Sequence, residues 1–207
     1  MNNTNLESVT FQPFIGKQYE KEPYKILLLG ESHYCSEYCA ANPDKKCKIT
    51  SAVVDRCFVG ERSHYRFFTG ALYAIFGQDA KREQMERPAF YNYVQEYAGN
   101  NSRIAPSDTA WKAAVQPFFD VLRELKPDLV ICCGKRLYDH LPDDPDKEKR
   151  AAGTELFNDG KYLWSRRYFY HIDDRAIPLV AIRHPSSVGF NGSAYHLKLK
   201  EFCKEIE

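Results

Sequence analysis

Three continuous apolar runs constrain the fold of this 207-residue chain more than any other feature of its sequence. They are YKILLLG (24–30), DLVICCG (128–134) and PLVAIRH (178–184), and each ends in a glycine or a polar residue. Strands that are apolar on both faces are typical of parallel sheets, because helices cover both sides of such a sheet. Residues 88–98 and 168–172 are aromatic and β-prone, and we expect them to add strands or extended segments.

Amphipathic helices are expected between and after these runs. The clearest helix covers residues 107–127, where Ser107 can cap the first turn and apolar side chains recur at helical spacing. Pro117 inside this segment predicts a kink, because its ring clashes with the preceding turn. Residues 62–77 and 192–206 also have helical apolar spacing. The alternation of strands and helices predicts an α/β protein with a mostly parallel sheet that is covered on both faces.

The length of the chain fits one domain, and we interpret residues 1–207 as a single unit. Within it, residues 1–23 are expected to form an N-terminal arm and residues 35–57 a Cys-rich insertion loop. The first residues have neither the basic start nor the apolar centre of a signal peptide, and no apolar run reaches membrane-spanning length. We therefore expect a soluble, cytoplasmic monomer that does not bind membranes.

The charge balance limits the kind of partner. The chain has 29 Lys and Arg against 28 Asp and Glu, which gives a net charge of +1. Proteins that bind nucleic acid usually concentrate basic residues on one face, because their affinity depends on phosphate contacts. A nearly neutral chain can offer DNA only a local basic patch. The candidates for such a patch are Lys135, Arg136, Arg183, Arg103, Arg166 and Arg167.

Polar residues follow the predicted strands directly. Glu31 and Ser32 follow the first apolar run, Lys135 follows the second, and His184 closes the third. Asn92 lies in the aromatic segment between them. Since the carboxyl ends of parallel strands meet at one edge of the sheet, where α/β proteins bind ligands, these side chains are expected to converge.

Five blocks occur in a fixed order along residues 24–190. They are LLLGESHY (27–34), RCFVG (56–60), FYNYVQEYAGNNSRIAPS (90–107), ELKPDLVICCG (124–134) and IRHPSS (182–187). In this order the blocks resemble the motifs of the uracil-DNA glycosylase superfamily, and of its family-4 branch more than the others. The resemblance implies a three-layer α/β/α sandwich with a central, mostly parallel four-stranded sheet. It also implies excision of uracil or another deaminated base from DNA, by base flipping and hydrolysis of the N-glycosidic bond.

The resemblance implies a role for four residues around the flipped base. Phe58 would stack on the base and Asn92 would read its edge with one donor and one acceptor. His184 would stabilise negative charge on a carbonyl oxygen as the glycosidic bond breaks, and Glu31 would orient or activate water. Each residue also has a structural interpretation. His184 and Asn92 can stabilise turns, Phe58 can be a core residue, and Glu31 can cap a helix.

Other positions of the motifs differ from the classical enzymes or extend the site. Ser32 stands where those enzymes have an aspartate that helps the water, and Tyr34 matches the tyrosine that excludes a 5-methyl group. Ser186 and Ser187 would contact the substrate, and the loop that follows would enter the minor groove, with Val188 or Phe190 as the wedge.

Four cysteines of the insertion, Cys35, Cys39, Cys47 and Cys57, are spaced C-x3-C-x7-C-x9-C. They can be free thiols or hold a structural zinc ion, which would stabilise a polar loop that has little core of its own. The family-4 branch binds an iron–sulfur cluster through cysteines that include a Cys-x-x-Cys pair before the first strand. This chain has no cysteine before Cys35, so we do not expect that cluster.

Three functions remain compatible with these motifs. The first is a DNA glycosylase, as above. The second is a diverged protein of the same fold that binds a nucleobase, a nucleotide or nucleic acid without cleaving it, or hydrolyses a different N-glycoside; the Ser32–His33 substitution, the Cys-rich loop and the neutral charge favour it. The third is an α/β interaction module, in which Glu31, Phe58, Asn92 and His184 would not lie together.

Overall fold

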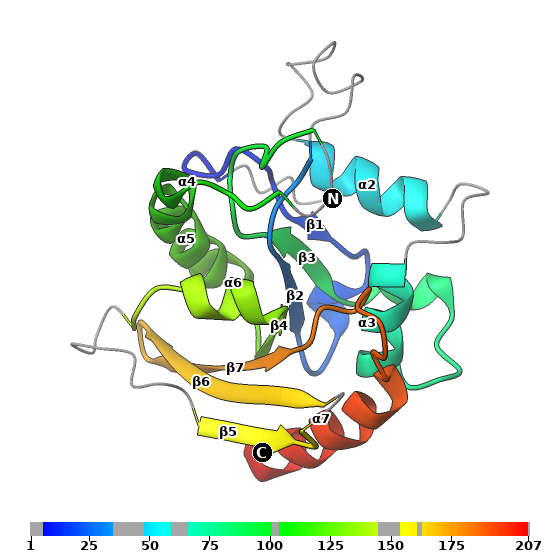
Figure 1. Cartoon of the computed structure of the whole chain (residues 1–207). Coiled ribbons are helices and arrows are strands. Elements are labelled where there is room, and N and C mark those ends of the chain that lie inside the picture. Colours follow the sequence, from blue (N-terminus) through cyan, green and yellow to red (C-terminus); the bar gives the residue numbers. More distant parts are fainter. Residues whose placement is uncertain are drawn as a thin grey trace.

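The computed structural model describes residues 6–34, 48–58, 66–100, 104–144, 154–160 and 163–206. The strands are β1 (Phe14–Ile15), β2 (Ile26–Gly30), β3 (Ala89–Asn92), β4 (Leu129–Cys133), β5 (Thr154–Asn158), β6 (Trp164–Ile172) and β7 (Arg175–Ile182). The α-helices are α2 (Ile49–Phe58), α3 (Arg66–Phe76), α4 (Asp108–Ala113), α5 (Val115–Leu125), α6 (Lys135–His140) and α7 (Gly192–Ile206). Two short 3-10 helices, η1 (Tyr19–Lys21) and η3 (Arg82–Glu86), complete the set (Figure 1).

The sheet contains seven strands in the order β1-β3-β2-β4-β7-β6-β5. The central four, β3, β2, β4 and β7, are parallel to one another, whereas β1 joins one edge antiparallel and β6 and β5 extend the other edge antiparallel. The predicted mixed α/β class is confirmed. The number of four strands that the resemblance implies is wrong, because β1, β6 and β5 add three antiparallel strands to the four parallel ones. Both ends of β5 are exposed, and an exposed edge strand has no buried face to mark it in the sequence.

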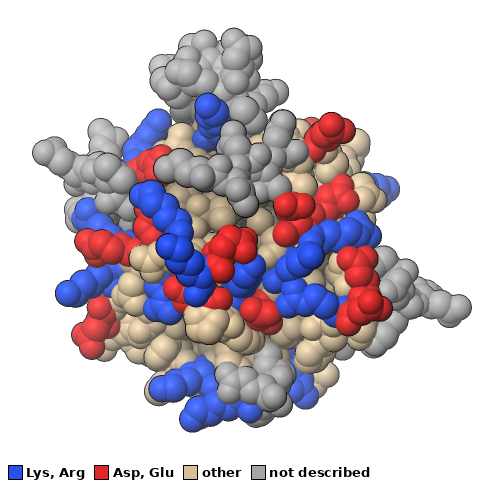
Figure 2. Space-filling model, turned by 180° about the vertical axis from the view of Figure 1, so that it is seen from behind, with Lys and Arg blue, Asp and Glu red and all other residues tan. Residues whose placement is uncertain are grey.

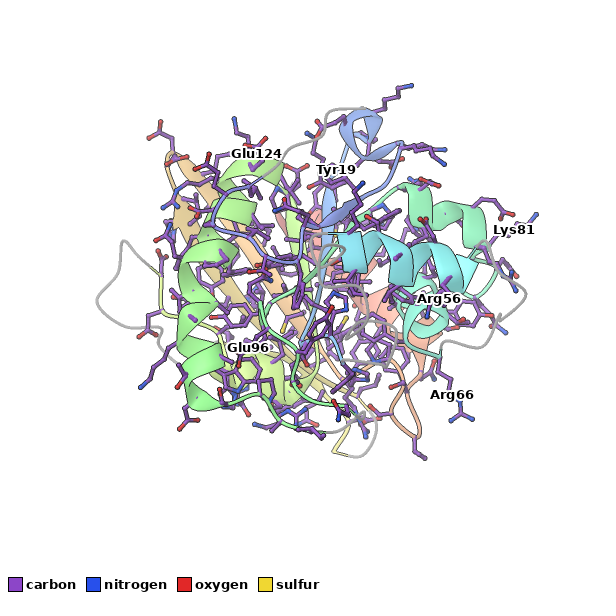
Figure 3. All side chains as sticks on the ribbon, turned by 90° about the horizontal axis from the view of Figure 1, so that it is seen from above. Tyr19, Arg56, Arg66, Lys81, Glu96 and Glu124 are labelled. Carbon is purple, nitrogen blue, oxygen red and sulfur yellow. The ribbon has the colours of Figure 1, made fainter. Side chains whose placement is uncertain are left out.

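Helices cover both faces of the sheet, and successive side chains of β2 divide between the two layers. Leu27 and Leu29 pack with the side chains of α4, α5 and α6, and Leu28 packs with those of α2, α3 and α7. This alternation is expected because neighbouring residues of a strand point to opposite faces. Figure 3 shows the same division from above, with Glu124 on one side of the sheet and Arg56 on the other.

The predicted helix over residues 107–127 is divided into α4 and α5 at Ala114. Ser107 caps α4 as expected, since its Oγ accepts a hydrogen bond of 3.1 Å from the amide of Ala110. Pro117 lies in the first turn of α5, where the backbone amide would lack a helical partner in any case. The proline therefore marks the start of a second helix, and the helix predicted over 192–206 corresponds to α7.

Residues 6–23, which belong to the predicted arm, pack against the sheet. Phe11 and Tyr19 are fully buried, and Phe14 pairs with Phe90 across the β1–β3 ladder. The aromatic residues of this segment explain why it is not a free arm: their burial stabilises its contact with the core. No helix among the described residues is long and apolar enough to span a membrane.

Candidate functional site

The carboxyl ends of the four parallel strands form one edge of the sheet. Gly30 at the end of β2 pairs with Asn92 at the end of β3, and the amide of Gly134 after β4 donates 2.8 Å to the carbonyl of Ile182 at the end of β7. The structure therefore brings the residues that follow these strands to the same edge, as the sequence predicts.

Asn92 is a buried amide beside a glycine that has no room for a side chain. It is 6% exposed, and a Cβ added to Gly30 would overlap the Oδ1 atom of Asn92. The backbone carbonyl of Asn92 accepts a hydrogen bond of 2.8 Å from Gln95 Nε2. Its side-chain amide makes no hydrogen bond to another described residue. Buried amides usually have partners, and among the described residues the donor and acceptor of Asn92 have none, which leaves them as candidates for contact with a ligand.

His184 is held in one tautomer by the turn that follows it. The backbone amide of Ser186 lies 3.3 Å from His184 Nδ1, and Ser186 Oγ lies 2.8 Å from the same atom. A backbone N–H can only donate, so Nδ1 is the acceptor and the proton of the neutral ring resides on Nε2. The imidazole therefore presents an N–H donor on the side away from its turn.

The surroundings of His184 favour this neutral form. The residue retains solvent access, but the protein around its ring removes part of its hydration and lowers the pKa below the usual 6.5. Glu31 acts in the opposite direction and Arg136 in the same direction as desolvation. These electrostatic effects show that Glu31 and Arg136 lie near His184, and the ring is uncharged at neutral pH.

Glu31 is engaged by a cation that comes from a different strand end. Arg136, on the first turn of α6, donates through Nε to Glu31 Oε2 at 2.7 Å and through Nη2 to Oε1 at 2.5 Å. The Glu31 side chain is 13% exposed, so the pair is partly shielded from water. Each carboxylate oxygen still has a second lone pair, and a water molecule can bind there. The sequence indicated Arg136 only as part of a basic patch, and its pairing with Glu31 could not be predicted from the sequence.

An aromatic ring lies beside His184, but it is not the one the motifs indicated. Phe67 of α3 lies 5.2 Å from the His184 ring and 5.8 Å from Phe90, between ring centroids. Phe58 is the last residue of α2, and its side chain lies outside the described residues. Phe67 belongs to the helical apolar pattern predicted over residues 62–77, but this pattern does not distinguish a residue that lines a ligand site from one in the core.

The other residues of the first motif occupy different environments. The Ser32 hydroxyl is buried and lacks a hydrogen-bond partner among the described residues. His33 is 5% exposed and its Nε2 lies 3.1 Å from the Thr50 hydroxyl, which connects the strand end to α2. Tyr34 is half-buried, and its interaction with Arg136 contributes, after that of Glu31, to raising the pKa of the guanidinium. Tyr34 therefore lies on the same side as the Glu31–Arg136 pair.

The turn after His184 presents one apolar residue to solvent. Ser187 stabilises the turn, because its Oγ and its amide donate to the His184 carbonyl at 2.5 and 2.8 Å. Val188 is 85% exposed, whereas Phe190 stacks on Tyr195 with 5.1 Å between ring centroids. Of the two wedge candidates, Val188 is the one that projects from the surface.

The Cys-rich segment is only partly described. Cys35, Cys39 and Cys47 lie outside the described residues, and residues 49–57 of the expected loop belong to α2 instead. Cys57 lies on the buried side of α2 and is 4% exposed. Burial raises the pKa of the Cys57 thiol to about 12 and so disfavours the thiolate that zinc requires. The described residues contain no cluster of three or more metal-ligating side chains.

The charged residues do not form one basic face in the view of Figure 2. Lys and Arg side chains alternate with Asp and Glu there. At the strand-end site, Lys135 pairs with Asp139 at 2.6 Å, and Arg103 lies outside the described residues.

The chain matches no protein-family model, and no curated protein sequence is significantly similar to it.

Proposed function

We propose that this protein hydrolyses the N-glycosidic bond of uracil or a related deaminated base in DNA, after flipping the base into the strand-end site. The observation that carries the proposal is the fixed tautomer of His184, whose Nδ1 accepts from Ser186 and whose Nε2–H makes no hydrogen bond to another described residue. A preorganised neutral donor suits a carbonyl oxygen that gains negative charge during a reaction.

The reaction balances with water as the only co-substrate. The bond between the sugar C1′ and the base nitrogen breaks, and its electron pair moves onto the base and its carbonyl oxygens. His184 stabilises this charge by hydrogen bonding. The oxygen of water forms a new bond to C1′ and keeps one of its two protons as the sugar hydroxyl, and the other proton neutralises the departing base anion.

Recognition of the base would rest on Asn92. Its buried amide offers one acceptor and one donor, which match the imide edge of uracil. Phe67 supplies an aromatic surface next to His184, and Phe58 stays a candidate for the same role. Flipping costs a few kcal/mol of stacking and pairing energy, so single-stranded DNA is the favoured substrate of a weakly charged protein.

Glu31 would position the attacking water, and Arg136 would hold Glu31. Both carboxylate oxygens already accept hydrogen bonds from the guanidinium, which keeps the carboxylate charged and fixed in orientation. A fixed carboxylate near C1′ can orient water and also stabilise the positive charge that develops on the sugar.

The test is excision of uracil from a single-stranded oligonucleotide, followed by cleavage of the abasic product. Wild-type protein should release uracil, and His184→Ala should reduce the rate roughly 100-fold, the usual cost of losing one such donor. His196→Ala is the matched control, because His196 of α7 is half-buried and bonds the Ile75 carbonyl near the end of α3, at the opposite end of that helix from Phe67. Absence of excision by wild-type protein, or equal rates for both variants, would overturn the proposal.

A second candidate is a protein that binds a nucleobase or nucleotide at this site without cleaving it. The observations that favour it are that Glu31 is already paired with Arg136 and that the Ser32 hydroxyl, at the position of the aspartate that helps the water in the classical enzymes, is buried. Calorimetry with uracil or deoxyuridine monophosphate distinguishes the two, because this candidate predicts saturable binding, lost in Asn92→Ala, without release of free base from DNA.

A further inference from the structure

A pocket of about 370 Å³ adjoins His184 on the side of the β5–β6 hairpin. Neither Asn92 nor Glu31 lines it, and the adjoining ends of β5 and β6 form one of its walls. Its lining residues are Lys135, Asn158, Gly160, Leu163, Trp164, Arg183, His184 and Ser187. The volume falls within the range of pockets that bind small organic ligands.

The walls of this pocket are fixed by one buried tyrosine. The Tyr195 hydroxyl donates to the Trp164 carbonyl at 2.8 Å and can accept from the amides of Trp164 and Arg183, each at 3.1 Å. These bonds connect the start of β6 to the end of β7. The tyrosine ring is fully buried, so Trp164 and Arg183 are held on a rigid base. Such a preorganised wall lowers the entropic cost of binding a ligand.

The chemistry of the lining indicates an aromatic group that carries a negative charge. Trp164 is half-buried, and its ring meets Tyr138 edge to face at 5.7 Å, which sets its orientation. The Lys135 ammonium lies 6.0 Å from the Trp164 ring, the outer limit of a cation–π contact. Lys135 also pairs with Asp139, but an exposed ion pair of this kind is weak and can exchange partners.

We propose that this pocket binds a nucleotide, with its base on Trp164 and its phosphate near Lys135 and Arg183. The pocket borders His184, so the nucleotide would be the neighbour of the target base in a DNA strand. That the nucleotide belongs to a DNA strand rests on the proposed function. A free nucleotide offers the same base and phosphate groups and is the alternative ligand. Stacking on tryptophan is independent of sequence, because every base has an aromatic face.

The test uses fluorescein-labelled single-stranded pentanucleotides whose central residue is 2′-fluoro-deoxyuridine, whose glycosidic bond resists hydrolysis. One has normal bases on both neighbours of that residue, and the other has abasic tetrahydrofuran there. Fluorescence anisotropy should show that wild-type protein binds the first at least about 5-fold more tightly, the lower limit for stacking of one base. Trp164→Leu should remove the preference, and Trp164→Phe should retain most of it.

Charge is tested with a matched pair of lysine variants. Lys135→Met should weaken binding of the normal pentanucleotide, whereas Lys112→Met, at an exposed site on α4 outside the pocket, should not. Adenosine monophosphate is added to distinguish the sources. If it quenches tryptophan fluorescence and binds more tightly than the pentanucleotide, the pocket takes a free nucleotide.

Failure of this inference differs from failure of the proposed function. If Trp164→Leu binds both pentanucleotides and adenosine monophosphate as wild-type protein does, and circular dichroism shows the same fold, the inference is overturned even where uracil is excised. If Trp164-dependent binding occurs without any excision, the pocket assignment stands and the glycosylase proposal fails.

Discussion

Arg136 and Glu31 are 105 residues apart in sequence and form a two-point ion pair at the carboxyl edge of the sheet. The guanidinium comes from the helix after β4, and the carboxylate follows β2. This pairing joins the candidate water-binding group to the neighbouring strand, so the orientation of Glu31 depends on the register of β2 and β4. It also places a permanent positive charge near His184.

The pair predicts that Arg136→Lys reduces excision with little effect on stability. A lysine keeps the charge but cannot make both hydrogen bonds, so Glu31 loses its fixed orientation. We expect the single-turnover rate to fall roughly 10-fold or more, and the free energy of unfolding to change by less than about 1 kcal/mol because the arginine is 42% exposed. Arg123→Lys, at the exposed Arg123–Asp120 pair of α5, is the control and should keep full activity.

Gly30→Ala should act through Asn92. The new Cβ would overlap Asn92 Oδ1, so the amide must move away from its present position. We expect ligand binding to weaken as much in Gly30→Ala as in Asn92→Ala, with unfolding free energy reduced by about 1–3 kcal/mol from overpacking. The double variant should bind no worse than either single variant, because both changes remove the same interaction. Additive losses in calorimetry would contradict this coupling.

The titration of His184 should report its surroundings directly. Because desolvation lowers its pKa, the ring should gain its proton below pH 6.5, and excision should stay constant above that pH and fall as the ring becomes charged. In the Glu31→Gln variant the pKa should decrease further, since the charge of Glu31 favours the protonated ring. Nuclear magnetic resonance of the ring Cε1–H signal measures both values, and a midpoint above 6.5 in wild-type protein would disprove the assignment.

His33 predicts a loss of stability in mild acid. Burial lowers its pKa to about 4, while the unfolded chain takes up the proton near 6.5. The unfolded state therefore binds more protons between these values, and stability falls as the pH drops through this window. From pH 7 to pH 5 this effect should remove about 2 kcal/mol. Urea unfolding should show that His33→Gln, which can still bond to Thr50 but does not titrate, loses that much less than wild-type protein.

The sequence by itself predicted the parallel centre of the sheet and the position of three candidate site residues at its strand ends. Apolar runs such as 128–134 must be buried on both faces, and this requirement alone predicts parallel strands with Glu31, Asn92 and His184 near their ends. A strand that is buried on both faces is recognised in the sequence as a continuous run of apolar residues.

Only the tertiary structure decided what those residues contact. The pairing of Arg136 with Glu31, the ring of Phe67 beside His184 and the attachment of Trp164 to Tyr195 join segments far apart in the chain. Strand β5 was not predicted from the sequence, because it lies at the edge of the sheet and its residues are exposed or only partly buried. Local patterns reflect whether a residue is buried; which distant residue it meets depends on strand order and helix packing, and these arise only when the whole chain folds.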